Sequence, residues 1–496
     1  MSTTISQNYL NSAAELNYLI ESAEKSYGSG DLYTALEFLK KVIKLSPGMT
    51  NIYFTMAVIY KKLKNYNESE KYYKTAIQNN PSFFEAYYNL GILYHESEQY
   101  SKAVECFSMS GQLNNSWHLA YYNLGNSLRE LEKFEEAVEA YSNSIKINPA
   151  HASSYYNRGV VQEKLLNFES ALTDYQYAMK IEPEHVDAHW NSSLILLAKG
   201  DYRNGFREYE WRLKTKENVK RVFAKPRLIN QDITGKRIFI YSEQGFGDAL
   251  QFVRYVDLLR KKGAYTTLEC DPKLYDLFTE AKCADQIVGR KSFSEPETDY
   301  NYYISMMSLP YYFSTTFETI PAQDKYLNIS NEKIEKWKDI LGESTGKKVG
   351  LFWQGNTHNL KGKERSCPVE LLKNITEIPA HTFYSLQVDG SNKDIDEKGL
   401  KINTLHEKGM TDFTDTAAVI ENLDLVITID SAVAHLAGAL GINTWLLLHY
   451  NPDWRWSGSP TDSAWYPSIR LFRQSEKNNW INVLESVQSE LLKNFI

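Results

Sequence analysis

A period of 34 residues runs through the first half of the chain and limits the folds open to it. Gly91, Gly125 and Gly159 lie 34 residues apart, within the segments YYNLG, YYNLG and YYNRG. An alanine follows each glycine after twelve residues, and an aromatic residue follows each alanine after four more. A fixed period of this length predicts stacked copies of one small unit, because each copy needs its neighbours to bury its apolar face.

The period and its residues resemble the tetratricopeptide repeat (TPR), a hairpin of two helices. In such a unit the glycine lets the first helix approach the second, and the alanine and the aromatic residue of the second helix fill the space between them. We therefore expect an α-helical solenoid over residues 12–219, with about six repeats. The whole chain has 35 tyrosines, and packing between helices accounts for most of those in this part of it.

One asparagine also recurs in each of four repeats and is a candidate for lining the concave groove. Asparagine side chains can pair with the main-chain amides of an extended peptide, which predicts a protein or peptide partner. The residues concerned are Asn89, Asn123, Asn157 and Asn191. The repeats are also a candidate surface for homo-oligomer formation.

Composition excludes several other classes of protein. The 55 Lys and Arg against 62 Asp and Glu give a formal charge of -7, so no basic excess favours a nucleic acid partner. The four cysteines show no C-x-x-C spacing, which argues against a structural zinc site. The sequence shows neither a secretory signal nor an apolar run of the ~20 residues that a membrane span needs. We expect a cytoplasmic protein without a membrane span.

After a linker over residues 220–235 the pattern changes to short apolar runs that alternate with helical stretches. This pattern is typical of α/β units with parallel strands. Strands are predicted at 237–243, 266–270, 301–306, 348–353, 382–387, 423–429 and 443–448. They suit two Rossmann-like domains, over 236–340 and 341–475, followed by a C-terminal helix over 476–496.

Two glycines and an acid follow the first predicted strand, within the segment EQGFGD. Open parallel sheets bind ligands at the carboxyl ends of their strands, and glycines there allow close approach of the backbone. Gln244, Gly245 and Gly247 are therefore candidate ligand contacts. Asp248 is either a helix cap or a general base, and the residue types alone favour the cap.

Three further strand ends could contact a ligand. The loop after GLFW carries Lys363 and Arg365, which could neutralise a pyrophosphate or could form an ordinary solvated basic loop. Ser385 and Gln387, at the end of FYSLQ, give a weaker signal for contacts with a nucleotide base. The segment DSAVAHLAGALG, from residue 430, begins a helix whose free N–H groups favour a diphosphate. Its His435 is either a core histidine or a contact to ribose or phosphate.

Other catalytic signatures are missing. The sequence contains no H-E-x-x-H, G-x-S-x-G or Walker-type lysine loop, which argues against a protease, an esterase and a P-loop NTPase.

These segments together resemble the glycosyltransferase module of bacterial TPR glycosyltransferases, which is related to lipopolysaccharide heptosyltransferases. The domain order is also similar to that of protein O-GlcNAc transferases. The matching stretches are EQGFGDALQFVRY, GLFWQGN, KERSCP, FYSLQ, DFTDTAAVIENLDLVITIDSAVAHLAGALG and DWRWSGSPTDSAWYPSIRLFRQ. The resemblance implies a GT-B fold of two Rossmann-like domains, with the nucleotide sugar on the second domain and the acceptor on the first. It also implies that the C-terminal helix crosses back onto the first domain. The predicted fold class is thus α + α/β.

The resemblance also implies roles for single residues in an inverting, metal-independent transfer with no cofactor beyond the nucleotide sugar. Asp248 matches the catalytic carboxylate, which favours a base over a cap, and Arg365 matches a cationic group for the phosphates. Ser431 stands where the family more often has threonine, and the hydroxyl is retained. The implied donor-binding residues are Gln244, Gly245, Gly247, Trp353, Asn356, Lys363, Ser385, Gln387, Asp430, Ser431, Ala432 and His435.

The acceptor implied in this way is a hydroxyl of a protein bound in the TPR groove, such as flagellin or another surface protein. A lipid-linked or surface glycan is an alternative acceptor. A non-catalytic adaptor with a degenerate nucleotide-sugar site is an alternative function. The DWRW segment, residues 453–456, either shapes the sugar pocket or packs the second domain.

Overall fold

The computed structural model describes residues 2–216, 221–344, 346–355, 360–388 and 393–494. Contacts between residues divide the chain into two compact units, Met1–Ala188 and His189–Ile496. Among the described residues, none of the helices has both the length and the apolar composition that crossing a bilayer requires.

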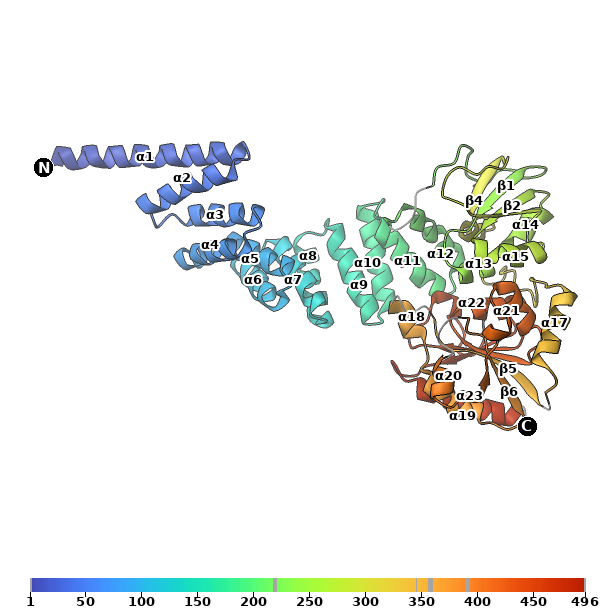
Figure 1. Ribbon diagram of the computed structural model, residues 1–496. Helices are drawn as coiled ribbons and strands as arrows, with labels where there is room; N and C mark the ends of the chain where they lie inside the picture. The colour runs from blue at the N-terminus through green and yellow to red at the C-terminus, as the bar shows by residue number, and fades with distance from the viewer. Residues whose placement is uncertain (1, 217–220, 345, 356–359, 389–392, 495–496) are drawn as a thin grey trace. The chain divides into compact units, whose positions relative to one another are not determined.

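The first unit consists of successive helical hairpins, as the 34-residue period predicts (Figure 1). Consecutive helices pack in pairs, α1 on α2, α3 on α4 and so on to α9 on α10. The helices are α1 (Ser2–Gly28), α2 (Leu32–Leu45), α3 (Thr50–Lys62), α4 (Tyr66–Asn79), α5 (Phe84–Glu96), α6 (Tyr100–Leu113), α7 (His118–Glu130), α8 (Phe134–Ile147), α9 (Ala152–Lys164) and α10 (Phe168–Ile181). The unit is a TPR solenoid.

The glycines of the period lie where two helices of one hairpin come closest. A Cβ atom built on Gly125 would lie 2.6 Å from the ring of Tyr141, closer than real contacts allow. Gly91 and Gly159 have the same relation to Phe107 and Tyr175. The predicted role of the glycine and the aromatic residue is confirmed, and it explains why Tyr141 and Tyr175 are fully buried.

The second unit begins with the last helical hairpin, formed by α11 (Val186–Ala198) from His189 onward and α12 (Tyr202–Tyr209). A short 3₁₀ helix, η1 (Glu210–Lys214), follows. Tyr202, Phe206 and Tyr209 belong to the same hydrophobic core as Phe252 of the first sheet domain. This shared core joins the last repeat to the α/β region.

The first sheet has four parallel strands in the order β3-β2-β1-β4. They are β1 (Arg237–Tyr241), β2 (Tyr265–Cys270), β3 (Gln286–Gly289) and β4 (Tyr302–Ser305). The helices of this domain are α13 (Phe246–Phe252), η2 (Val253–Tyr255), α14 (Val256–Lys261), α15 (Pro272–Glu280), η3 (Met306–Ser308) and α16 (Leu309–Tyr312). The helical stretch after β1 is divided into α13, η2 and α14.

The second sheet has six parallel strands in the order β10-β9-β8-β5-β6-β7. They are β5 (Lys347–Phe352), β6 (His381–Ser385), β7 (Ile402–Asn403), β8 (Leu425–Ile429), β9 (Thr444–Leu448) and β10 (Ile469–Arg473). Its helices include α17 (Asn331–Leu341), α18 (Leu360–Arg365), α19 (Lys373–Thr376), α20 (Lys393–Glu397), α21 (Phe413–Ile420), α22 (Ala432–Ala439), η7 (Trp454–Trp456) and α23 (Trp480–Asn494). The two sheets with their helices form two Rossmann-like domains, in agreement with the predicted fold class.

The seven predicted strands are confirmed, whereas β3, β7 and β10 are additional. One expectation is wrong: α23 does not cross back onto the first domain. Its apolar residues, from Trp480 to Leu491, pack in the core of the second sheet with Val349 and Trp445. Arg470 of the edge strand β10 also pairs with Glu490 of α23 at 2.8 Å. The helix therefore completes the domain that it follows.

We expect Gly125→Leu to lower the free energy of unfolding by about 1–3 kcal/mol, because the new side chain overlaps the immobile ring of Tyr141. Gly28→Leu is the matched control, since no atom lies within 4 Å of a Cβ built on Gly28. Urea unfolding followed by circular dichroism measures both changes. Equal stability of the two variants would contradict close packing at Gly125.

Candidate functional site

Both sheets contain a point where the strand order reverses, and ligands of open α/β sheets bind at such points. In the first sheet the reversal lies between β1 and β4, and in the second between β5 and β8. Gln244 and Gly245 lie in the loop from β1 into α13, and Asp248 follows in the first turn of α13. The loop from β8 into α22 contains Asp430 and Ser431. The most specific predicted motifs therefore lie at the two reversal points.

The two loops meet at one cavity of about 340 Å³. Helices α13 and α22, which begin at these loops, pack on each other. The predicted site residues that line the cavity are Gln244, Gly245, Gly247, Asp248, Arg365, Asp430, Ser431, Ala432 and His435. The fold thus brings together residues that are almost 200 positions apart in the sequence.

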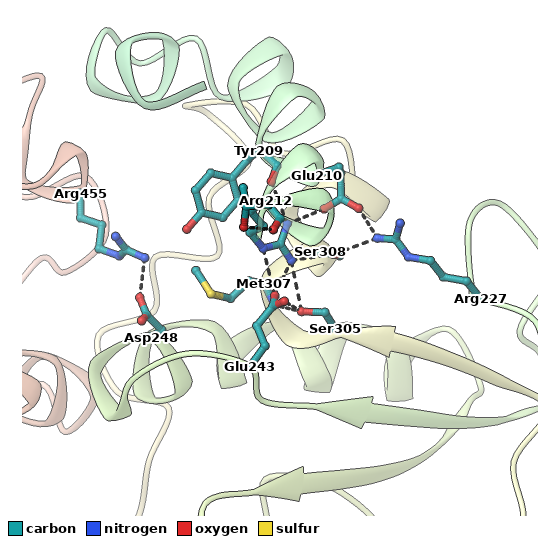
Figure 2. A network of polar contacts seen from close by, with 11 residues as sticks. Tyr209, Glu210, Arg212, Arg227, Glu243, Asp248, Ser305, Met307, Ser308 and Arg455 are labelled. Carbon is teal, nitrogen blue, oxygen red and sulfur yellow. Dashed lines mark hydrogen bonds and ion pairs between the residues drawn. The ribbon is translucent and has the colours of Figure 1, made fainter. Parts of the chain in front are cut away.

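Asp248 forms an ion pair that the sequence did not reveal. Its Oδ1 atom accepts a hydrogen bond of 2.5 Å from Nη2 of Arg455, which lies in η7 of the second domain (Figure 2). Asp248 is in the first turn of α13, and the cap position of that helix is occupied by Gly245. Asp248 is thus not the cap residue, and its carboxylate faces the cavity.

Arg455 holds three groups at once. Its Nη1 atom donates to Asp453 at 2.7 Å and its Nε atom to the side chain of Gln251 at 2.7 Å. Because Gln251 and Asp248 both belong to α13, the guanidinium group connects the second domain to the first. Burial raises the pKa of Asp248 and the Arg455 cation opposes that rise. In the sequence, the one available signal was the segment DWRW, in which the charged residues Asp453 and Arg455 alternate with tryptophans.

The second-domain loop presents an open helix N-terminus. Ser431 is the cap residue of α22, but its side chain makes no hydrogen bond to the helix. The first N–H groups of a helix without such a cap remain able to bind an anion. Asp430 lies beside this end, with its Oδ2 atom 3.5 Å from Nη1 of Arg365. Burial raises the pKa of Asp430 and Arg365 opposes the rise.

His435 is buried and also lines the cavity. Its Nδ1 atom lies 2.7 Å from the Tyr466 hydroxyl in the interior. Burial lowers its pKa well below the ordinary value, so the ring is neutral at pH 7. A Cβ atom on Gly247 would lie 2.7 Å from this ring. Glycine at that position lets helices α13 and α22 pack closely together.

Four other predicted donor residues, all among the described ones, do not line this cavity. Gln387 is buried, and its Oε1 atom accepts hydrogen bonds from the N–H groups of Trp353 and Gln354. Ser385 in turn accepts one from the N–H of Gln387, and both Ser385 and Trp353 are buried. These side chains thus stabilise the end of β5. Lys363 belongs to the short helix α18 and is not part of the cavity lining, and Asn356 lies outside the described residues.

The repeated asparagines contact neighbouring helical turns and repeats. Asn123 donates to the Tyr88 hydroxyl at 2.9 Å, and Asn157 donates to the Tyr122 hydroxyl at 3.0 Å. Asn89 donates to the Glu85 carbonyl of its own helix. Two of the four asparagines therefore link adjacent repeats, while Asn191 belongs to the second unit and is not part of the cavity lining.

A second buried arginine, Arg212 of η1, fixes the edge of the first sheet (Figure 2). Its guanidinium group donates to Glu243 at 2.5 Å, to Glu210 at 2.9 Å and to Ser308 at 2.9 Å. Glu243 directly precedes the Gln244–Asp248 loop. Ser305, at the end of β4, bonds both to Arg212 and to Glu243. Arg212 therefore connects the end of the last repeat to the reversal point of the first sheet, which sequence analysis did not predict.

Comparisons with known proteins support the repeat assignment. Family models described as tetratricopeptide or TPR repeats match residues 50–83, 72–105 and 125–165. Protein FlbA of Caulobacter vibrioides is a distant homologue, 25% identical over 289 residues. The match covers 53% of this chain and 48% of FlbA, so the chain spans about half the length of this curated relative.

Several solved structures are also similar. A crystal structure of MamA is 22% identical and covers 35% of this chain and 96% of its own, with a TM-score of 0.33. YrrB, described as a TPR protein with an unusual peptide-binding site, is 23% identical with a TM-score of 0.34. The match covers 39% of this chain and 97% of the YrrB chain. Pseudomonas aeruginosa pilF is 16% identical with a TM-score of 0.36, and the match covers 41% of this chain and 92% of the pilF chain. Scores this low support no conclusion about the present chain.

We expect Arg212→Met to destabilise the protein by about 3–5 kcal/mol, because it leaves Glu243 buried without its cation. The double variant Arg212→Met/Glu243→Gln should recover part of that loss, since it removes the unpaired charge as well. Guanidinium unfolding of both variants measures the difference. If Arg212→Met alone is as stable as the wild type, the ion pairs of Arg212 do not contribute to the stability of the protein.

Proposed function

We propose that the chain is a glycosyltransferase that moves a sugar from a nucleotide sugar to a hydroxyl group of a polypeptide. One observation carries the proposal. The carboxyl ends of both Rossmann-like sheets meet at one cavity, with the half-buried carboxylate of Asp248 on one side and an open helix N-terminus beside an arginine on the other. The resemblance of the motifs to TPR glycosyltransferases supports the same function.

The donor fits the side of the second domain. The N-terminus of α22 offers main-chain N–H groups and the positive end of the helix dipole to a diphosphate. Arg365 lies at the same place, and its contact with Asp430 is a loose one of 3.5 Å. Its remaining N–H groups can bind phosphate oxygens and stabilise the negative charge that develops on the leaving nucleotide.

The acceptor hydroxyl fits the side of the first domain, beside Asp248. The carboxylate takes the proton as the hydroxyl oxygen forms its bond to the anomeric carbon. The bond from that carbon to the phosphate oxygen breaks at the same time, and its electron pair leaves with the nucleotide. Attack from the face opposite the phosphate inverts the anomeric centre.

Burial and Arg455 have distinct effects on Asp248. Burial raises the pKa of the carboxyl group and so makes the carboxylate a stronger base. Arg455 opposes that rise and fixes the direction of the carboxylate through the 2.5 Å bond. The TPR repeats bind proteins in general, which supports a polypeptide acceptor rather than a lipid-linked glycan.

We expect one of UDP, ADP, GDP and CMP to raise the thermal unfolding midpoint of the purified chain. A nucleotide present at 100 times its Kd stabilises by about 2.7 kcal/mol. Arg365→Ala should weaken this effect, while Arg237→Ala, which changes an exposed arginine of the other sheet, should not. A wild-type chain that none of the four nucleotides stabilises would contradict the donor site.

We expect Asp248→Asn to lower the rate of nucleotide release from the nucleotide sugar by about 10²–10⁴-fold, the usual contribution of a general base. The exposed Asp299→Asn serves as the control. If Asp248→Asn releases nucleotide as fast as the wild type, Asp248 is not the general base.

The pH profile of kcat/KM gives an independent measurement. Asp248 acts only when deprotonated and burial raises its pKa, so activity should fall on acidification above the ~3.9 of an ordinary aspartate. Arg455→Met removes the cation that lowers this pKa, and the acid limb should therefore move to higher pH. An acid limb that stays at the same pH in Arg455→Met would contradict the inference that Arg455 lowers the pKa of Asp248.

A further inference from the structure

The cavity has an apolar wall that comes from the last helical repeat. Trp190 and Leu194 of α11 and Tyr209 of α12 line it, together with Trp454 of the second domain. Leu194 follows Trp190 by four positions on the same helix, so the two side chains lie on one face. Both are half-buried. The repeat region thus supplies part of the site itself.

This wall is held in place by packing and by a buried arginine. The rings of Trp190 and Tyr209 lie 5.0 Å apart, and those of Tyr209 and Trp454 lie 6.4 Å apart. Tyr209 is only 2% exposed, and its carbonyl accepts a hydrogen bond of 3.1 Å from Arg212. A wall built from such buried rings is preformed rather than assembled by the ligand.

Trp190 differs in residue type from the residues at the same position of the earlier repeats. Tyr88, Tyr122 and Tyr156 hold the same position at steps of 34 residues. The Tyr88 and Tyr122 hydroxyls accept hydrogen bonds from asparagines of the next repeat. Tryptophan has no hydroxyl to use in this way. The last repeat therefore presents a larger, less polar surface at this position.

The remainder of the lining carries charge. Asp248, Asp430 and Asp453 face Arg365 and Arg455, so the carboxylates outnumber the guanidinium groups. A bound nucleotide sugar would add the negative charge of its phosphates. An acidic acceptor segment would be repelled here, whereas an apolar side chain would find a surface on Trp190 and Leu194.

We propose that Trp190, Leu194 and Tyr209 form an acceptor subsite that takes an apolar side chain next to the hydroxyl-bearing residue of a polypeptide. The subsite rests on the proposed glycosyltransferase function and specifies its acceptor.

The test compares two peptides, Gly-Leu-Ser-Leu-Gly and Gly-Asp-Ser-Asp-Gly. Each is incubated with the full chain and an equimolar mixture of UDP-N-acetylglucosamine, GDP-mannose, ADP-heptose and CMP-N-acetylneuraminic acid. Mass spectrometry measures sugar transfer to the peptide, and released nucleotide is measured in parallel. We expect the leucine peptide to be modified at least about tenfold faster, which corresponds to about 1.4 kcal/mol.

Two variants alter the wall. Trp190→Ala should bring the ratio of the two rates towards one, and Leu194→Lys should shift it in favour of the aspartate peptide through charge attraction. Leu492→Lys, an exposed leucine of α23 in the same unit, should keep the wild-type ratio. The ratio does not depend on the fraction of folded protein, so a loss of stability cannot imitate the result.

A wild-type ratio near one, or a ratio that Leu194→Lys leaves unchanged, overturns the subsite. Release of nucleotide without modification of either peptide also overturns it, while the donor half of the proposed function stands. If the wild type releases no nucleotide from any of the four nucleotide sugars, the proposed function fails and the subsite fails with it.

Discussion

The buried guanidinium group of Arg455 is the contact on which the candidate site depends. It joins Asp453 of the second domain to Asp248 and Gln251 of α13 in the first. Burying a charge is costly unless paired groups compensate it, and Arg455 has such a group at each of these three contacts. The two domains thus meet with Asp248 in one defined position, because any other position would leave this charge with Asp453 as its remaining partner among the three.

Arg212 has the same role for the end of the repeats. Its contacts with Glu243 and Ser308 connect η1 to two loops at the carboxyl edge of the first sheet. The hydrophobic residues Tyr202 and Phe206 of α12 continue the core of that domain. The last hairpin therefore belongs physically to the α/β region, although its sequence belongs to the repeats. A cavity with one wall from a repeat helix follows from this continuity.

Sequence analysis predicted those features that depend on local patterns. The glycines opposite Tyr141 and Tyr175, seven of the strands and the position of the two loops at strand ends were correctly anticipated. The strands β3, β7 and β10 were missed, and the two residues of β7 are too few to carry a periodic signal. Ser385 and Gln387 were correctly placed at a strand end, but the direction of their side chains depends on packing, and they support β5 instead of lining the cavity.

The sequence by itself determined the class of each part, because a 34-residue period and alternating apolar runs are properties of neighbouring residues. Only the tertiary structure decided which charged groups meet. The partners Asp248 and Arg455 are 207 positions apart, and Arg212 and Ser308 are 96 apart. Such pairs form where separate elements pack on each other, and no local pattern encodes that meeting. The same holds for Trp190, whose repeat position indicates a helix but whose place in the cavity wall results from the fold.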